Sequence, residues 1–222
     1  MAPSPTLAFA AKFLRLPGHE GRLVPMRMHR EQRQFFARWD ARRPDGRRQF
    51  SQGLISWPKQ SFKTTSGSLA LLADLYGGHG PDREYVVVST GTTQANDVGF
   101  AALVRFIERA PALLADTRIL SSEIVFEERI EDPRTGGHYV QNHRVTVLPS
   151  QRAADWHHGR PLTGSWIDEC WALGDRGYAL LEAVMPSPTR DGWVLVTSYA
   201  GLRQHARPGV LLFRRKHHAL GA

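Results

Sequence analysis

Two kinds of apolar pattern alternate along the chain. Some segments are short apolar runs that predict buried strands, and others have apolar residues every three or four positions, which is the spacing of one helix face. The predicted strands cover residues 49–57, 83–90, 122–130, 138–148, 164–173 and 192–201. The predicted helices cover residues 29–43, 63–78, 92–110 and 176–185, and "FAAKFLRLP" near the N-terminus predicts one more short amphipathic helix.

The order of these elements indicates the fold class. Strands alternate with helices except where two strands flank the turn-rich "EDPRTGG" and predict an antiparallel hairpin. Alternation favours an α/β fold: a mostly parallel sheet with helices on both faces, carrying the hairpin as an insertion. Ligands bind such sheets at the carboxyl ends of the strands. We divide the chain into a lead-in of residues 1–48, a core of residues 49–205 and a basic tail of residues 206–222.

Composition narrows the partners without choosing one. The 29 Lys and Arg exceed the 21 Asp and Glu, which gives a formal net charge of +8. A basic surface attracts phosphate polymers, but charge alone does not separate DNA, RNA and membrane surfaces. The single cysteine, Cys170, excludes an internal disulfide framework and is expected to be a buried, inert thiol. The N-terminal apolar stretch is too short for a signal peptide or a membrane span.

The stretch "SWPKQSFKTT", residues 56–65, is close to a phosphate-binding loop. In the pattern G-x-x-x-x-G-K-[ST], Lys63 and Thr64 match, whereas Trp57 and Phe62 replace the two glycines. A predicted strand precedes the loop and a predicted helix begins at the lysine, and a helix N-terminus presents unpaired N–H groups to an anion. We therefore expect Lys63 to reach the β- and γ-phosphates and Thr64 to place its hydroxyl on Mg²⁺.

Two further strand ends carry polar side chains. The strand "WIDEC" ends in Asp168 and Glu169, which would hold Mg²⁺ and polarise an attacking water, respectively. The alternative is a pair of solvated carboxylates. The strand "VLVTSYAG" ends in Thr197 and Ser198, whose hydroxyls would lie near the γ-phosphate, unless this is an ordinary strand-to-turn junction.

In this order, the motifs resemble those of the ATPase domain of the large terminase subunit of tailed bacteriophages. The resemblance runs over nearly the whole chain. "PKQSFKTT" matches a Walker A motif of the form P-[RK]-Q-x-G-K-T, in which the first glycine is often missing in this family. The other matching segments are "FAAKFLRLPGHEG", "HREQRQFF", "VVVSTGTTQAND", "WHHGRPLTGSWIDECW" and "VTSYAG".

The resemblance implies a P-loop NTPase fold of the RecA/ASCE type and an ATPase that uses ATP and Mg²⁺ to move double-stranded DNA into procapsids. It implies catalytic roles for Lys63 and Glu169, metal ligation by Thr64 and Asp168, and coupling by Thr197 and Ser198. The nucleotide-binding residues it implies are Gln32, as the adenine-recognition glutamine, and Lys59, Gln60, Ser61, Phe62, Lys63, Thr64 and Thr65. The implied partners are double-stranded DNA, a portal protein, a small terminase subunit and further copies in a ring, with no membrane, in the host cell cytoplasm.

Two features depart from the family pattern. If the loop requires a positive φ at Phe62, a residue with a Cβ costs of order ~1 kcal/mol there, although a ring that points outward would leave the N–H groups usable. The chain stops shortly after "TSYAG", and the acidic cluster of the family's nuclease domain is absent. We therefore expect no nuclease activity in this chain, whether it is truncated or split from such a domain.

Several residues have no settled role. Lys59 stands where family members often have an arginine, and Arg152 and Arg160 precede the Asp-Glu strand, so each is a candidate for a transition-state contact. The adjacent histidines at 157–158 and 217–218 lack the spacing of zinc ligands. The basic "FRRKHH" either contacts a DNA backbone or is a solvated tail.

Two other functions fit part of the pattern. In the first, Phe62 weakens catalysis and the chain is a DNA-binding or assembly subunit that retains the fold. In the second, the chain is a helicase fragment, although 222 residues leave no room for a second motor lobe.

Overall fold

The computed structural model describes residues 4–58, 60–89, 95–149, 161–170, 182–186 and 191–199. Its centre is a seven-stranded sheet with the order β3-β9-β8-β4-β7-β6-β5. The strands are β3 (Gln52–Trp57), β4 (Glu84–Ser89), β5 (Thr117–Ile119), β6 (Glu123–Glu131), β7 (His138–Pro149), β8 (Gly164–Asp168) and β9 (Trp193–Tyr199).

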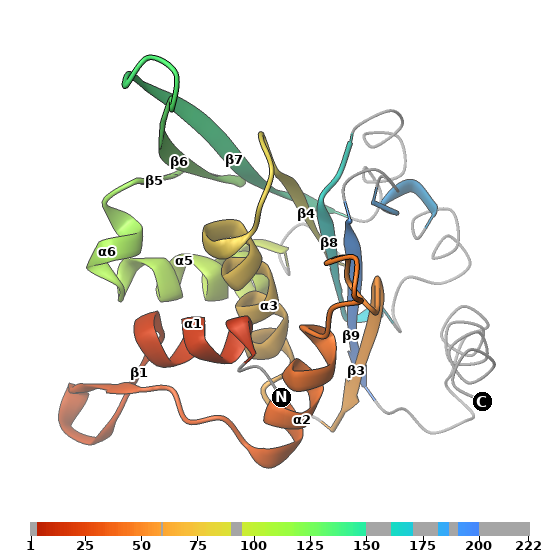
Figure 1. Ribbon diagram of the computed structural model, residues 1–222. Coiled ribbons are helices and arrows are strands. Elements are labelled where there is room, and N and C mark those ends of the chain that lie inside the picture. Colours follow the sequence, from red (N-terminus) through yellow and green to blue (C-terminus); the bar gives the residue numbers. More distant parts are fainter. Residues whose placement is uncertain are drawn as a thin grey trace.

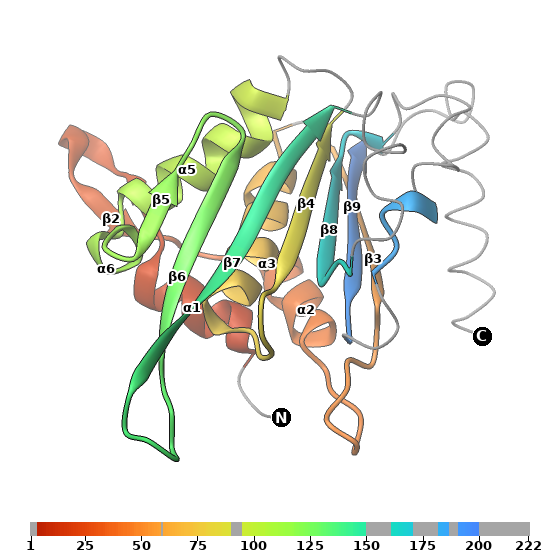
Figure 2. The same ribbon diagram turned by 90° about the horizontal axis from the view of Figure 1, so that it is seen from above.

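The sheet is mostly parallel, as the element order predicts. Strands β3, β9, β8, β4 and β7 run parallel to one another, whereas β6 pairs antiparallel with β7 and with β5. The predicted hairpin is confirmed as β6 and β7, which project beyond the sheet (Figure 2). Strand β9 is the last of these in sequence, yet it lies between β3 and β8. This placement brings three parallel carboxyl ends next to one another.

The main helices lie on one face of the sheet (Figure 1). They are α1 (Pro5–Phe13), α2 (Arg30–Trp39), α3 (Lys63–Gly77), α5 (Ala101–Glu108) and the short α6 (Pro111–Leu114). Strand side chains alternate between the faces, so Tyr85 and Val87 join the core under these helices, while Val86 and Val88 join a second apolar cluster on the other face. In the described residues, Val184 contributes to the cover of that second cluster.

Several element boundaries differ from those predicted. The strand expected over 164–173 ends at Asp168 because Glu169 has a φ of 53°, which extended backbone does not allow. The helix expected over 92–110 is divided between a π-helical segment, η2 (Ala95–Phe100), and α5. Most of the helix expected over 176–185 lies outside the described residues. The sequence pattern did not predict α6, β5, the 3₁₀ turn η1 (His19–Gly21) or the small antiparallel sheet of β1 (Arg15–Pro17) and β2 (Leu23–Pro25).

Helix α3 is fixed to the sheet at two points. Near its start, Gly67 faces the indole of Trp166 on β8, and a Cβ built at Gly67 would lie 2.2 Å from that ring. Nearer its end, Asp74 accepts hydrogen bonds from Trp193 Nε1 at 2.7 Å and from Arg48 Nη2 at 2.6 Å. Both contacts are on side chains that are buried or nearly so. The position of the α3 N-terminus relative to the strand ends follows from these contacts.

Within the described part of the chain, every helix is too short or too polar to span a bilayer.

Candidate functional site

The carboxyl ends of β3, β9 and β8 meet at the N-terminus of α3. Asp168, the last residue of β8, pairs in register with Thr197 on β9, and Ser56 on β3 pairs with Ser198. The chain leaves β3 after Trp57 and enters α3 at Lys63. The predicted loop and both predicted strand ends are therefore neighbours in space, as the parallel sheet requires.

The loop between β3 and α3 has a bent backbone. Gln60 and Phe62 have φ values of 58° and 61°, and Phe62 is in the left-handed conformation directly before helical Lys63. A left-handed residue beside a helical one is the backbone pairing that forms anion-binding nests. The φ that a glycine adopts freely is thus present here on a phenylalanine. Lys59 lies outside the described residues.

Side chains close the loop upon itself. Pro58 O accepts hydrogen bonds from the Ser61 hydroxyl and from Lys63 Nζ, the latter at 2.7 Å. Lys63 is only 5% exposed. Its ammonium group therefore lies inside the loop rather than in solvent, where it can exchange a carbonyl partner for a phosphate oxygen.

The N-terminus of α3 suits an anion. The helix is 15 residues long and has no acidic residue in its first turn, and no side chain of Phe62 caps it. The first-turn N–H groups, which include that of Thr65, lack carbonyl partners within the helix and carry its positive dipole end. This is the setting in which protein helices bind phosphate.

Asp168 is the centre of a small buried network. Its carboxylate accepts hydrogen bonds from Thr197 Oγ1 at 2.6 Å, from the Glu169 N–H at 3.1 Å and from Thr64 Oγ1 at 3.3 Å. Burial raises the pKa of this carboxyl above its ordinary value, although the hydrogen bonds from Thr197 and Thr64 act in the opposite direction. A cation beside the group would favour its charged form.

The Thr64 and Asp168 oxygens are suitable ligands for Mg²⁺. This cation prefers hard oxygen donors and keeps much of its coordination for water and substrate phosphates. The described residues contain no group of three or more His, Cys, Asp or Glu side chains that could enclose a metal by themselves. One carboxylate beside one hydroxyl, at a helix N-terminus that suits phosphate, fits Mg²⁺ that arrives with a nucleotide.

Glu169 follows Asp168 at the turn that ends β8. It is 9% exposed, and its positive φ turns the chain away from the strand direction. The predicted acid–base pair is therefore adjacent and largely shielded from solvent. The role of Glu169 as general base stays a prediction.

Thr197 and Ser198 lie on opposite faces of β9. Thr197 belongs to the α3 face and donates to Asp168, while its hydroxyl accepts a hydrogen bond from Trp166 Nε1 at 2.9 Å. Ser198 belongs to the other face, where its buried hydroxyl has no hydrogen-bond partner among the described residues. Of the two predicted coupling residues, the geometry thus brings only Thr197 to the Asp168 network.

Gln32 lies inside the fold. Its side chain is 2% exposed, and both ends of its amide are engaged: Oε1 accepts the His29 N–H at 2.9 Å, and Nε2 donates to Ser66 Oγ at 3.2 Å. These bonds join the start of α2 to the first turn of α3. The predicted contact of Gln32 with adenine stays a prediction, but its visible function is to brace the loop.

Four residues at this site were not predicted from the sequence. Trp166 and Gly67 position Thr197 and α3, His29 contacts the Phe62 ring with centroids 5.5 Å apart, and Ser66 holds Gln32. Cys170 is buried, as expected, and burial raises the pKa of its thiol to about 11. The candidates Arg152 and Arg160, the paired histidines and the basic tail lie outside the described residues.

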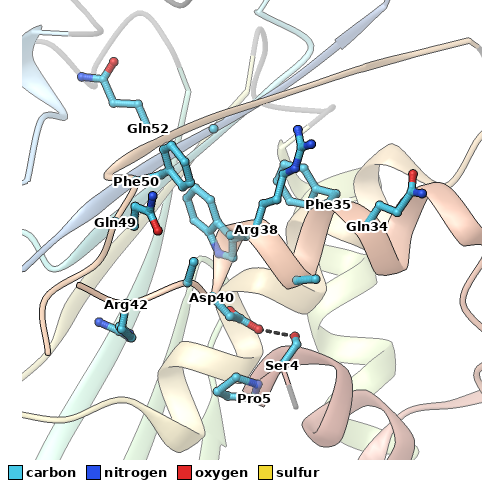
Figure 3. A pocket seen from close by; sticks show the side chains of 14 residues that line it. Ser4, Pro5, Gln34, Phe35, Arg38, Asp40, Arg42, Gln49, Phe50 and Gln52 are labelled. Atoms are coloured by element: carbon cyan, nitrogen blue, oxygen red, sulfur yellow. Dashed lines mark hydrogen bonds between the residues drawn. The ribbon is translucent and has the colours of Figure 1, made fainter. Parts of the chain in front are cut away.

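A large surface cavity lies away from this site. It has a volume of about 1200 Å³ and is lined by residues of α2, the approach to β3 and the chain before α1, including Phe35, Arg38 and Phe50 (Figure 3). None of the predicted site residues lines it. It is at the amino end of β3, whereas the loop follows the carboxyl end.

Comparison with solved structures places this fold among phage terminases. The chain is similar to the large terminase of bacteriophage HK97, with a TM-score of 0.71, 18% identity, and coverage of 99% of this chain and 41% of that one. It is also similar to the large terminase ATPase domain of Thermus phage P74-26, with a TM-score of 0.59, 17% identity, and coverage of 81% and 68%. The large terminase of another thermophilic bacteriophage, in complex with ADP, has a TM-score of 0.54, 9% identity, and coverage of 78% and 39%.

The likeness lies in the fold, since all of these identities are low. No protein-family model matches the sequence, and no curated protein matches it either. The predicted fold class is confirmed: the chain is a mixed α/β protein with the fold of terminase ATPase domains. It spans less than half the length of the HK97 terminase.

Proposed function

We propose that this chain is a phage large terminase ATPase domain, which hydrolyses ATP to drive double-stranded DNA into procapsids. The observation that carries the proposal is the Asp168 network at the N-terminus of α3. A buried carboxylate that joins a helix-start hydroxyl, Thr64, to a neighbouring strand hydroxyl, Thr197, is an arrangement suited to Mg²⁺ and a nucleotide.

In this proposal, the phosphates bind where Lys63 and the α3 N-terminus converge. Lys63 exchanges the Pro58 carbonyl for phosphate oxygens and neutralises charge that develops in the transition state. Thr64 and Asp168 hold Mg²⁺, which when bound neutralises charge on the β- and γ-phosphate oxygens. Glu169 orients water and accepts its proton, and the low exposure of this carboxylate limits competing solvent.

Thr197 gives the site a path to the rest of the sheet. Its hydroxyl joins Asp168 to Trp166 Nε1, and the Trp166 ring packs against Gly67 of α3. A change at Asp168 on hydrolysis or product release would therefore be felt by β8, β9 and α3 together. We propose this link as the coupling element, with Ser198 contributing from the opposite face.

The proposed partners follow from the terminase assignment. They are double-stranded DNA, held through its phosphates by the basic surface, a portal protein, a small terminase subunit and other copies of this chain in a ring. The proposed location is the host cell cytoplasm. No nuclease activity is expected from the residues of this chain.

The second candidate is a nucleotide-binding or DNA-binding assembly subunit without turnover. The left-handed conformation of Phe62 favours it, because a strained loop would hold the phosphates less well. The two functions differ in hydrolysis and agree in fold.

ATP turnover by the purified chain, with and without duplex DNA, separates them. The proposal predicts turnover that rises with DNA and that Glu169→Gln reduces by about 100-fold or more, in line with loss of a general base. Glu108→Gln, on an exposed position of α5, is the matched control and should leave turnover unchanged. Turnover equal in wild type and Glu169→Gln would contradict the motor and leave the assembly subunit.

A further inference from the structure

An exposed aromatic pair stands beside the phosphate loop. Phe62 directly precedes the N-terminus of α3, and its ring lies against the imidazole of His29 with centroids 5.5 Å apart and planes at 33°. Phe62 is 46% exposed, and His29 is exposed as well. Two rings thus meet at the surface, next to the place proposed for phosphate.

The backbone conformation of Phe62 is not explained by packing. Its φ of 61° and ψ of 28° are unfavourable for a residue with a Cβ. The core gains little in return, since nearly half of the side chain faces solvent. Strained residues that persist in a fold are concentrated at ligand sites, so this observed outlier points to a role in binding.

Both rings are anchored to the same turn of α3. Phe62 is the residue that begins the helix, and its carbonyl accepts the Ser66 N–H at 2.9 Å. On the other side, the His29 N–H donates to Gln32, and Gln32 donates to Ser66 Oγ. The distance between the rings is therefore set by the first turn of α3 rather than by a free loop.

We propose that the Phe62 and His29 rings form the stacking surface for the base of the nucleotide whose phosphates bind at the α3 N-terminus. The inference rests on the proposed function, because it concerns the same nucleotide. Aromatic side chains stack on any base through its π-face. Gln32, buried and engaged at both ends, positions His29 instead of reading the base edge. Stacking without edge contacts gives similar affinities for ATP and GTP and a lower affinity for CTP.

The test compares a ligand with a base and a ligand without one. Dissociation constants for ATP and for inorganic tripolyphosphate, both with excess Mg²⁺, are measured by calorimetry for each variant, and their ratio isolates the base. The wild type should bind ATP about ten-fold or more tightly than tripolyphosphate. Phe62→Leu should lower this ratio about ten-fold, whereas Phe62→Tyr should keep it.

Two further variants guard the result. Phe62→Gly suits the positive φ and folds without strain, and the ratio should fall as it does in Phe62→Leu. Phe50→Leu removes an equally exposed ring, 46% exposed, from the distant cavity, and the ratio should stay unchanged.

Two results would overturn the stacking surface. A ratio that is unchanged in both Phe62→Leu and Phe62→Gly would mean that the ring acts on the phosphate loop alone, and the proposed function would stand without the stacking surface. Failure of the wild type to bind either ligand would overturn both the stacking surface and the proposed function.

Discussion

Replacing Gly67 by alanine should damage the site from the far side of α3. A Cβ at this position would lie 2.2, 2.4 and 2.6 Å from three atoms of the Trp166 indole, all closer than side-chain contacts allow. Trp166 is fully buried, so its ring cannot move into solvent. Overpacking a core costs typically ~1–3 kcal/mol, and this overlap belongs at the upper end. The better helix propensity of alanine returns about 1 kcal/mol, which leaves a net loss of about 2 kcal/mol.

A matched control is available in the same helix. At Gly77, the last residue of α3, an added Cβ meets nothing within 4 Å. Gly77→Ala should therefore be neutral or should stabilise the protein by up to about 1 kcal/mol. Urea unfolding followed by tryptophan fluorescence gives the free energy of unfolding of both variants.

The same variant reports on the site. Displacing Trp166 moves the donor to Thr197 and, through it, the Asp168 carboxylate, so Gly67→Ala should also weaken binding of Mg²⁺ with ATP. If Gly67→Ala unfolds at the same or a higher urea concentration than Gly77→Ala, the argument that close packing of α3 on Trp166 fixes the site is wrong.

Three other changes test separate features. In Asp168→Asn, the hydrogen-bond acceptor remains and the buried charge is lost, so unfolding in the absence of ligand should need as much urea as in the wild type or more; the stabilisation of about 2.7 kcal/mol that Mg²⁺ and ATP give the wild type at 100 times the dissociation constant should fall by at least half. Burial lowers the pKa of His143 below its ordinary 6.5, so the unfolded chain takes up the proton first, and the free energy of unfolding should hold above that pH and fall below it by up to about 1.4 kcal/mol per pH unit; pH-dependent urea unfolding should show this slope and lose it in His143→Gln. Arg48→Ala leaves Asp74 without its buried partner and should cost ~3 kcal/mol or more by urea unfolding, whereas Arg42→Ala, in an exposed ion pair, should cost ~1 kcal/mol or less.

The convergence of the site was predictable because sheet geometry enforces it. Lys63, Thr64 and Asp168 each follow or end a strand in an alternating α/β pattern, and parallel strands place such residues at one edge. The hairpin of β6 and β7 was equally readable, since turn residues separate two apolar runs of nearly equal length.

Other features depend on contacts that leave no periodic signal. The brace formed by Gln32 and Ser66 joins residues 34 positions apart, and Trp166 meets Gly67 through tertiary packing alone. Strand β5 and helix α6 are too short to show a period. The separation of Thr197 from Ser198 was within reach, because neighbouring strand residues always face opposite sides.

The most direct test of the account is the affinity for Mg²⁺ with ATPγS in the wild type and in Lys63→Ala, measured by calorimetry. Lys63 Nζ lies in the loop, so its loss should weaken binding about ten-fold or more, which corresponds to ~1.4 kcal/mol. Lys12→Ala, an exposed lysine of α1, should bind like the wild type. Equal affinity in the wild type and Lys63→Ala would mean that the nucleotide does not bind at this loop, and the account would be wrong.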